Sequence, residues 1–344
     1  MVAASGPSLR DRINRIAYVL VNVSDVERSK NFYEAISPLR AVTRTAAPLQ
    51  RFAGLGIDRG AFDGYILNDG TGDPSTGLPA EVHLVQWRTP EPVGRPYPTF
   101  WHVGLVKLAF RTPSAPAKLA QLAGLGIHTT NRLIYRGYVS IQDPDGIVVS
   151  FVGSHTAELP EGETDPRRYE RLVHTNPSVS DIERAVDFYG RLIGLDVVGE
   201  YAPGRVMPVS QGPGADVAQW IGYPHTARGG GFFLELNHFA HPPRSDADLV
   251  PYTEPTHLGI AAVGFEVDDI DACYEILLVA ADAGMCRPPV CPPEEWDYGT
   301  ERGVRRVVVF HDPDGIRLEL TERRAFVPTR RPTVPDNPPP LPGV

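Results

Sequence analysis

The segment VSDIERAVDFY at residues 179–189 occurs almost unchanged at residues 23–33, where the sequence reads VSDVERSKNFY. Both copies keep the Val-Ser-Asp opening, the Glu-Arg pair and the closing Phe-Tyr, at an offset of 156 residues. Self-similarity at a long fixed offset indicates a repeated structural unit. The chain of 344 residues is therefore predicted to contain two related halves.

Two further matches extend the repeat along both halves. HVGL at 102–105 corresponds to HLGI at 257–260, at an offset of 155. DPDGI at 143–147 corresponds to DPDGI at 312–316, at an offset of 169. The halves are collinear, and the larger third offset places an insertion of about 14 residues in the second half, which the stretch 286–300 can hold.

Each half also has a doubled pattern. Every quarter opens with a β-rich run, continues into a helix-like stretch and returns to short apolar runs broken by turns. In the third quarter, Arg171–Val179 is the predicted opening strand, and Ser180 or Asp181 caps the following helix. The second DPDG turn joins runs at 307–310 and 316–320 as a hairpin. We predict an α+β fold of four βαβββ units.

Composition limits the class of protein and its partners. Apolar residues make up 42% and charged residues 22%, as in ordinary globular chains. The net charge of −9 opposes the contacts that nucleic acids and anionic membranes require. The N-terminus lacks the apolar core of a signal peptide, and no run reaches the roughly 18 apolar residues that span a bilayer. We expect a partner that is neither nucleic acid nor membrane.

The cysteines indicate a reducing compartment. Cys273, Cys286 and Cys291 are the only three, all late in the chain, and an odd late cluster is no disulfide framework. Their spacing lacks a second cysteine pair or a nearby histidine pair, so core or loop positions are favoured over a zinc site. These features predict a cytoplasmic protein.

Domain boundaries follow from the repeat and from the turn-rich stretches. Residues 10–153 and 168–324 are the two predicted repeat domains, and the polar, Pro- and Gly-containing stretch 154–167 is the linker between them. Residues 325–344 are rich in proline, which favours an extended tail.

Together, VSDxERxxxFY after an opening strand and DPDGIxxEL near the end of a unit resemble the vicinal oxygen chelate superfamily of glyoxalases, bleomycin-resistance proteins and extradiol dioxygenases. The resemblance covers nearly the whole chain. It implies that paired βαβββ modules curl into open cups, here one for each half. It also implies a divalent metal ion inside a cup, held by residues on the first and last strands of its modules.

On this pattern, the implied metal ligands of the second half are His174 on the first strand of the third module, Glu235 on its last strand, and Glu319 on the last strand of the fourth. Such a set suits Fe²⁺, Mn²⁺, Zn²⁺ or Ni²⁺. Apolar neighbours flank both glutamates, so alternation places each carboxylate on the face opposite those neighbours. Either Glu235 or Glu319 can also act as the catalytic base.

The fourth module departs from the pattern because Ala262 stands at its first-strand position. His257 is a possible substitute, but it lies five residues earlier. An odd separation in a strand puts two side chains on opposite faces unless a bulge intervenes. His102 occupies the same repeat position as His257, which suggests a shared structural purpose.

The first half departs further, since its corresponding residues are Tyr18, His83, Lys107 and Ser150. A Lys ammonium would repel a metal ion. We interpret the first half as a degenerate module pair that supports the second, although Tyr18, His83 and Lys107 can also line an anion pocket.

Other polar residues near the motifs have two interpretations each. His238 and His241 follow Glu235 and either gate the cup or lie in a solvated loop, which we favour. Tyr298, Arg302 and Arg306 precede the last hairpin; they contact an anionic substrate, or the arginines form surface ion pairs.

Three functions follow from the resemblance. The first is a metal-assisted lyase, isomerase or cyclase, in which the ion chelates vicinal oxygens of a small metabolite and stabilises an enolate. The second is an extradiol ring-cleaving dioxygenase, which Ala262 opposes because its iron needs two His and one carboxylate. The third is a non-enzymatic small-molecule binding or resistance protein. Four modules already supply two cups, so a monomer and a homodimer are both compatible.

Overall fold

The computed structural model describes residues 6–72, 76–130, 137–201, 216–223, 231–241, 245–299 and 303–323. The strands are β1 (Ile13–Asn22), β2 (Arg40–Phe52), β3 (Ile57–Gly72), β4 (Pro79–Thr89), β5 (Gly104–Thr112), β6 (Tyr138–Gln142), β7 (Val148–Gly153), β8 (Arg171–Val179), β9 (Asp196–Tyr201), β10 (Asp216–Tyr223), β11 (Phe233–His241), β12 (Gly259–Val267), β13 (Glu294–Asp297), β14 (Val304–His311) and β15 (Arg317–Glu322). The α-helices are α1 (Val26–Ile36), α2 (Ala115–Gly124), α3 (Ile182–Val186) and α4 (Ile270–Asp282). Short turns of other helix types are η1 (Ala53–Leu55), η3 (Pro166–Tyr169), η4 (Asp187–Leu192) and η6 (Asp246–Leu249).

The element order confirms the predicted α+β class. The first quarter (13–89), the third (171–241) and the fourth (259–322) each run strand, helix, then three strands. The second quarter (104–153) runs strand, helix and two strands within the described residues. β8 coincides with the predicted opening strand, and β14 and β15 form the predicted hairpin. The predicted tail at 325–344 lies outside the described residues, and no helix among those described is long and apolar enough to cross a membrane.

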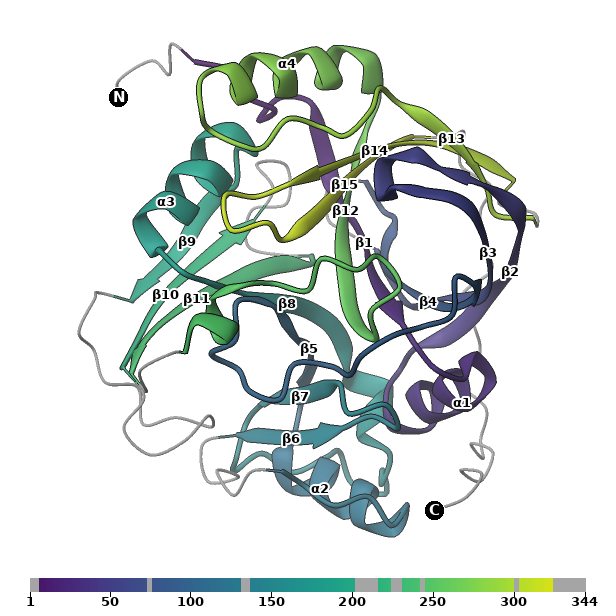
Figure 1. Cartoon of the computed structure of the whole chain (residues 1–344). Helices are drawn as coiled ribbons and strands as arrows, with labels where there is room; N and C mark the ends of the chain where they lie inside the picture. The colour runs from purple at the N-terminus through teal and green to yellow at the C-terminus, as the bar shows by residue number, and fades with distance from the viewer. Residues whose placement is uncertain are drawn as a thin grey trace.

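The strands form two curved sheets that do not follow the predicted division into halves. The eight-stranded sheet has the order β13-β14-β15-β12-β1-β4-β3-β2, and the seven-stranded sheet has the order β6-β7-β5-β8-β11-β10-β9 (Figure 1). β1 pairs with β12, so the first quarter joins the fourth. β5 pairs with β8, so the second quarter joins the third. The expectation of one cup for each half is corrected here, because a repeat fixes what each unit contains and leaves its pairing partner open.

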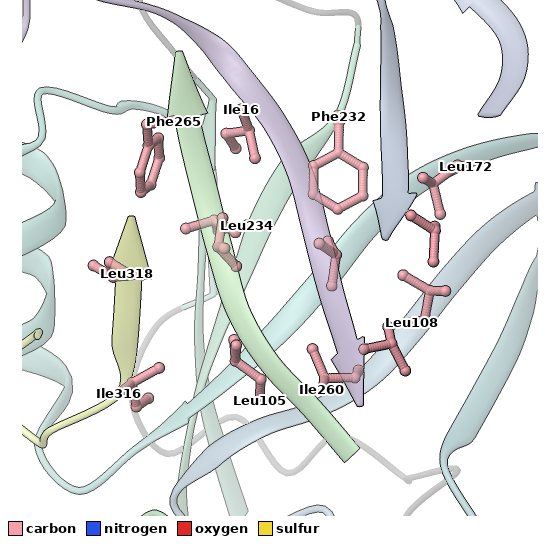
Figure 2. Close-up of a cluster of buried hydrophobic side chains, with 14 of the residues drawn as sticks. Ile16, Leu105, Leu108, Leu172, Phe232, Leu234, Ile260, Phe265, Ile316 and Leu318 are labelled. Atoms are coloured by element: carbon pink, nitrogen blue, oxygen red, sulfur yellow. The ribbon is translucent and has the colours of Figure 1, made fainter. Parts of the chain in front are cut away.

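A shared hydrophobic core lies between the two sheets. Figure 2 shows it with side chains from both sides: Ile16, Ile260, Phe265, Ile316 and Leu318 come from the eight-stranded sheet and the turn before β15, and Leu105, Leu108, Leu172, Phe232 and Leu234 come from the seven-stranded sheet and the residue before β11. Leu318 and Leu320 belong to this core, as do Leu234 and Leu236. Because side chains alternate along a strand, Glu319 and Glu235 point away from the shared core, each on the far face of its own sheet.

The repeated sequence motifs contact each other. Asp25 and Asp181 cap α1 and α3, as their position before each helix predicts. The serine before each cap donates its backbone N–H to the second aspartate of a DPDG turn, Ser24 to Asp145 at 3.0 Å and Ser180 to Asp314 at 2.8 Å. We call these two contacts the motif latches. They join the first quarter to the second and the third to the fourth.

Each latch is completed by the arginine and the tyrosine of the same motif. Arg28 pairs with Asp145 at 2.8 Å. The Tyr33 hydroxyl donates to Asp143, and the Tyr189 hydroxyl donates to Asp312, both at 3.1 Å. The conserved spacing of the repeat therefore reflects contacts between quarters as well as helix capping.

Candidate functional site

The far face of the eight-stranded sheet forms a packed pocket that we call the aromatic cup. Its core consists of Ala17, Tyr18, Leu20, Ala47, Phe52, Ile57, Phe62, Val85, Trp87, Ala262, Trp296, Tyr298, Val307 and Val309. Phe52, for example, packs edge-on against both Trp87 and Trp296, each at 5.3 Å between ring centroids. Six of these fourteen side chains are aromatic.

Four residues of the aromatic cup stand at the positions where the resemblance places metal ligands: Tyr18, His83, Ala262 and Glu319. The Tyr18 hydroxyl donates to Glu319, and the Tyr18 ring stacks on His83 at 4.2 Å. Burial, followed by the neighbouring Glu319, raises the pKa of Tyr18 well above its ordinary value. Arg317 pairs with the other oxygen of Glu319 at 2.8 Å. Protein groups therefore hold both carboxylate oxygens of Glu319.

The far face of the seven-stranded sheet carries the second constellation, which we call the polar cup. Its four corresponding residues are Lys107 on β5, Ser150 on β7, His174 on β8 and Glu235 on β11. Lys107 and His174 are buried, and the Glu235 side chain is 15% exposed. Glu235 is therefore the most accessible of these four residues.

Glu235 lies at the centre of the polar cup. Its Oε1 is 3.8 Å from Lys107 Nζ and accepts a hydrogen bond from the Asn176 amide at 2.7 Å. Its Oε2 is 3.5 Å from His174 Nε2. Lys107 also donates to the Tyr138 hydroxyl at 3.1 Å. One carboxylate thus faces an ammonium on one side and an imidazole on the other.

The protonation states in the polar cup follow from this geometry. Burial alone would raise the pKa of Glu235, but His174, Lys107 and the Asn176 amide hold it below its ordinary value. Burial alone would lower the pKa of Lys107, but Tyr138 and Glu235 raise it. Burial lowers the pKa of His174 to about 4, although Glu235 opposes this. At neutral pH the cup therefore holds a carboxylate, an ammonium and a neutral imidazole.

His174 has unused hydrogen-bonding capacity. Both ring nitrogens are buried without a hydrogen-bond partner among the described residues, as are Asn176 Oδ1 and Ser178 Oγ. An unpaired buried polar atom costs about 1–3 kcal/mol. Since His174, Asn176 and Ser178 alternate along β8, they share one face. A row of unpaired polar atoms on the cup face is what a polar ligand would satisfy.

The donor set does not fit the divalent metal ion that the resemblance implies. Of the four corresponding residues of the polar cup, only His174 and Glu235 are metal-ligand types, because Lys107 stays protonated and the Ser150 hydroxyl is shared with Tyr138 and Ser140. The ammonium already balances the charge of Glu235. In the aromatic cup, Ala262 offers no donor. The parts of the chain that the structure describes contain no group of three or more His, Cys, Asp or Glu that could hold an ion.

The structure brings together two of the three predicted ligands. His174 and Glu235 meet in the polar cup, whereas Glu319 lies in the aromatic cup of the other sheet. Tyr18 and His83 are likewise in a different sheet from Lys107, so they do not line one anion pocket. The prediction grouped residues of the same half into one site, but each sheet combines one quarter from the first half with one from the second. Residues of the same half are therefore separated.

His257 and His102 have the shared structural role that the repeat suggests. His257 precedes β12, and its Nδ1 lies 2.9 Å from the Leu258 carbonyl oxygen. His102 makes the same contact with Val103 at 3.0 Å. His257 belongs neither to the four ligand positions of the aromatic cup nor to the four of the polar cup.

The remaining candidates lie elsewhere. His238 and His241 belong to β11, which corrects the favoured loop interpretation, and His238 Nδ1 contacts the Val179 carbonyl oxygen at 3.2 Å. Tyr298 is buried among the rings of the aromatic cup. Arg306 pairs with Asp271 at 2.7 Å, a surface ion pair. Arg302 is outside the described residues.

The three cysteines are free, as expected. Cys273 and Cys286 are buried and Cys291 is half-buried. Sequence reasoning missed Tyr138 and Asn176, because neither stands at a motif position and both reach Lys107 or Glu235 only through pairing between strands.

Comparison with known proteins agrees with the fold. The family model of the Glyoxalase/Bleomycin resistance protein/Dioxygenase superfamily matches residues 171–320. Glyoxalase I from Zea mays superposes with a TM-score of 0.59 at 15% identity, covering 90% of this chain and 92% of that one. A provisionally named dioxygenase from Bacillus subtilis subsp. subtilis str. 168 superposes with a TM-score of 0.53 at 13% identity, covering 90% and 86%. These likenesses concern the fold alone, and no curated protein matches the chain.

Proposed function

We propose that this chain, which carries a domain of the Glyoxalase/Bleomycin resistance protein/Dioxygenase superfamily at residues 171–320, is an isomerase or lyase that works on a small oxygenated substrate in its polar cup. The supporting observation is the placement of Glu235 between the Lys107 ammonium and the His174 imidazole. The substrate class is an α-hydroxy carbonyl compound, whose two neighbouring oxygens match the two sides of this arrangement.

Lys107 supplies the positive charge in the proposed reaction. It donates a hydrogen bond to the carbonyl oxygen, where negative charge collects when the adjacent carbon loses its proton. A fixed cation in a water-poor site stabilises such charge far better than solvent does. The Tyr138 hydroxyl, 3.1 Å from Lys107 Nζ, orients the ammonium.

Glu235 is the proposed base. It is ionised at neutral pH and takes the proton from the carbon, while the electron pair of the C–H bond moves to the carbonyl oxygen beside Lys107. The isomerisation is complete when Glu235 returns the proton to the former carbonyl carbon and the α-hydroxyl proton passes to the oxygen beside Lys107, so that the carbonyl and hydroxyl groups exchange places. Elimination follows instead when the substrate carries a further hydroxyl on the β-carbon, which takes the proton from Glu235 and leaves as water. A positioned base typically contributes about 10²–10⁴-fold in rate.

His174 binds the second oxygen of the substrate. Its ring is neutral, and its nitrogens lack partners among the described residues, so one nitrogen can accept the substrate hydroxyl proton in a hydrogen bond. Glu319, the other base considered from the sequence, has no share in this site because Tyr18 and Arg317 hold it in the aromatic cup.

Proton exchange with solvent tests the proposal without knowledge of the final product. A panel of α-hydroxy ketones and α-hydroxy aldehydes is incubated with the protein in D₂O, and loss of the α-proton signal is followed by NMR. We expect exchange for at least one compound with the wild type. The exchange rate should fall by about 10²-fold or more in Glu235→Gln, and it should be unchanged in the control Glu322→Gln. Saturable binding without exchange would indicate a binding protein instead, and equal loss in both variants would contradict the proposal.

A further inference from the structure

A cavity of about 270 Å³ opens at one side of the aromatic cup. The ends of β12, β14 and β15 line it, and residues 54–56 and 251–258 close it. Val309 borders both the cavity and the packed rings. Lys107, His174 and Glu235 are not among the lining residues, so this cavity is separate from the polar cup.

One wall of the cavity is a stack of rings. Tyr97 and Tyr252 stack at 4.0 Å between centroids, and Tyr252 and His257 stack at 3.6 Å. All three line the cavity. Gly104 makes room for the stack, because a Cβ there would lie 2.3 Å from the Tyr97 ring. Tyr97 and His257 therefore cover the two faces of Tyr252, and the stack borders the cavity with apolar ring edges.

The wall of Arg287, His311 and Arg317 is cationic. His311 pairs with Arg317 across the β14–β15 hairpin, and its backbone bridges to Arg287 on the other side. Arg317 is half-buried and paired with Glu319, whereas Arg287 is exposed and makes no ion pair with another described residue. Two guanidinium groups therefore converge on one cavity.

Few negative charges oppose these arginines. Among the described residues that line the cavity, Glu254 is the only carboxylate, and it is exposed at the rim. Burial, with Arg317 and Arg287 nearby, lowers the pKa of His311 to about 4, so its ring adds no charge at neutral pH. Because Glu319 pairs with Arg317, Arg287 is the lining arginine that has no ion-pair partner among the described residues, and Glu254 contributes one negative charge to the same lining.

We propose that this cavity binds a small monocarboxylate, with the apolar body of the ligand beside the edges of the Tyr252 and His257 rings and its carboxylate at Arg287 and Arg317. The volume suits a compact ligand, since it lies just below the roughly 300–1,000 Å³ of drug-sized sites. Paired guanidinium donors match the two oxygens of a carboxylate. With one unpaired guanidinium and the Glu254 carboxylate in the same lining, a monoanion is favoured over a phosphate dianion.

Calorimetric titration with benzoate tests the site, with benzamide as the neutral analogue of the same shape and inorganic phosphate as the competing anion. We expect benzoate to bind with one-to-one stoichiometry, and benzamide and phosphate to bind at least about tenfold more weakly, since a charge-assisted hydrogen bond is roughly twice as strong as a neutral one. Arg287→Met should weaken benzoate by a similar factor. Because Arg287 is exposed, this variant should keep the unfolding midpoint of the wild type.

Two controls assign the effect to the cavity. Arg59 is an exposed arginine outside it, and Arg59→Met should leave benzoate affinity unchanged. Glu235→Gln in the polar cup should also leave it unchanged, which separates this test from that of the proposed function. Absence of saturable benzoate binding, equal binding of benzamide, or preferred binding of phosphate would overturn the proposal.

Discussion

The side chain of Lys107 is buried inside the polar cup, 3.8 Å from Glu235. Lys107→Met removes the balancing charge and leaves the Glu235 carboxylate beside the neutral groups of Asn176, Asn237 and His174. We expect a loss of about 1–3 kcal/mol in the free energy of unfolding, the cost of an unpaired buried polar group, measured by urea denaturation.

The double variant Lys107→Met/Glu235→Gln is the matched control, since it removes both charges at once. It should recover stability relative to Lys107→Met alone, because an uncompensated carboxylate costs more than a neutral pair. Equal stability of the single and double variants would mean that the two charges do not interact.

Gly264 shows how tightly the aromatic cup is packed. A Cβ at this position would lie 2.2 Å from the Tyr18 ring. Gly264→Ala should therefore destabilise the protein by about 1–3 kcal/mol, as overpacking typically does. Gly124, at the end of α2, has open space around it, and Gly124→Ala should be neutral or stabilise by up to about 1 kcal/mol. Urea denaturation of both variants checks the contrast, which equal effects would refute.

At the scale of elements, the two motif latches explain why the chain keeps Tyr and Asp at matching places in both halves. Asp143 and Asp312 are buried under Tyr33 and Tyr189. Burial raises the pKa of each carboxyl to about 7, although the tyrosine hydroxyls and backbone N–H groups oppose this. In an unfolded chain the same carboxyl titrates near 4.

This difference predicts a pH dependence of stability. Between about pH 4 and pH 7 these two carboxyl groups keep protons in the folded state that they have released in the unfolded state, so their contribution to stability falls as the pH rises and levels off above 7. His174 and His311, whose pKa values burial lowers to about 4, contribute with the opposite sign, so the urea midpoint of Asp143→Asn/Asp312→Asn should change more favourably with rising pH than that of the wild type. An unchanged slope would assign the dependence to other groups.

The elements themselves were largely predictable from the sequence. β8, the Asp181 cap and the β14–β15 hairpin depend on neighbours in the chain, so local patterns predict them. The faces of Glu235 and Glu319 also follow from alternation along each strand. His238 was misplaced because a polar stretch at a strand end resembles a loop, while pairing with β10 extends β11 through it.

The whole molecule is a closed ring of four chain quarters. Sheets join the first quarter to the fourth and the second to the third, and the motif latches join the first to the second and the third to the fourth. The sequence did not reveal this, because β1 and β12 are nearly 250 residues apart and repeated units do not state which copy pairs with which. The predicted ligand set failed at Glu319 for the same reason.

The ring predicts that neither half folds alone. Fragment 1–160 keeps β1 and β5 but lacks their partner strands β12 and β8. Fragment 161–344 keeps β12 and β8 but lacks β1 and β5. Expressed separately, each should lack cooperative unfolding and a dispersed amide NMR spectrum, and co-expression should restore both. Cooperative unfolding of an isolated half would contradict this topology.

The central claim is that an internal ammonium takes the place of a metal ion in the polar cup. Metal content after stripping with a chelator and reloading with Zn²⁺ or Ni²⁺, measured by elemental analysis, tests it most directly. The wild type should retain far less than one equivalent, and Lys107→His, which adds a third ligand beside His174 and Glu235, should retain about one. One equivalent in the wild type, lost in His174→Ala, would contradict the account.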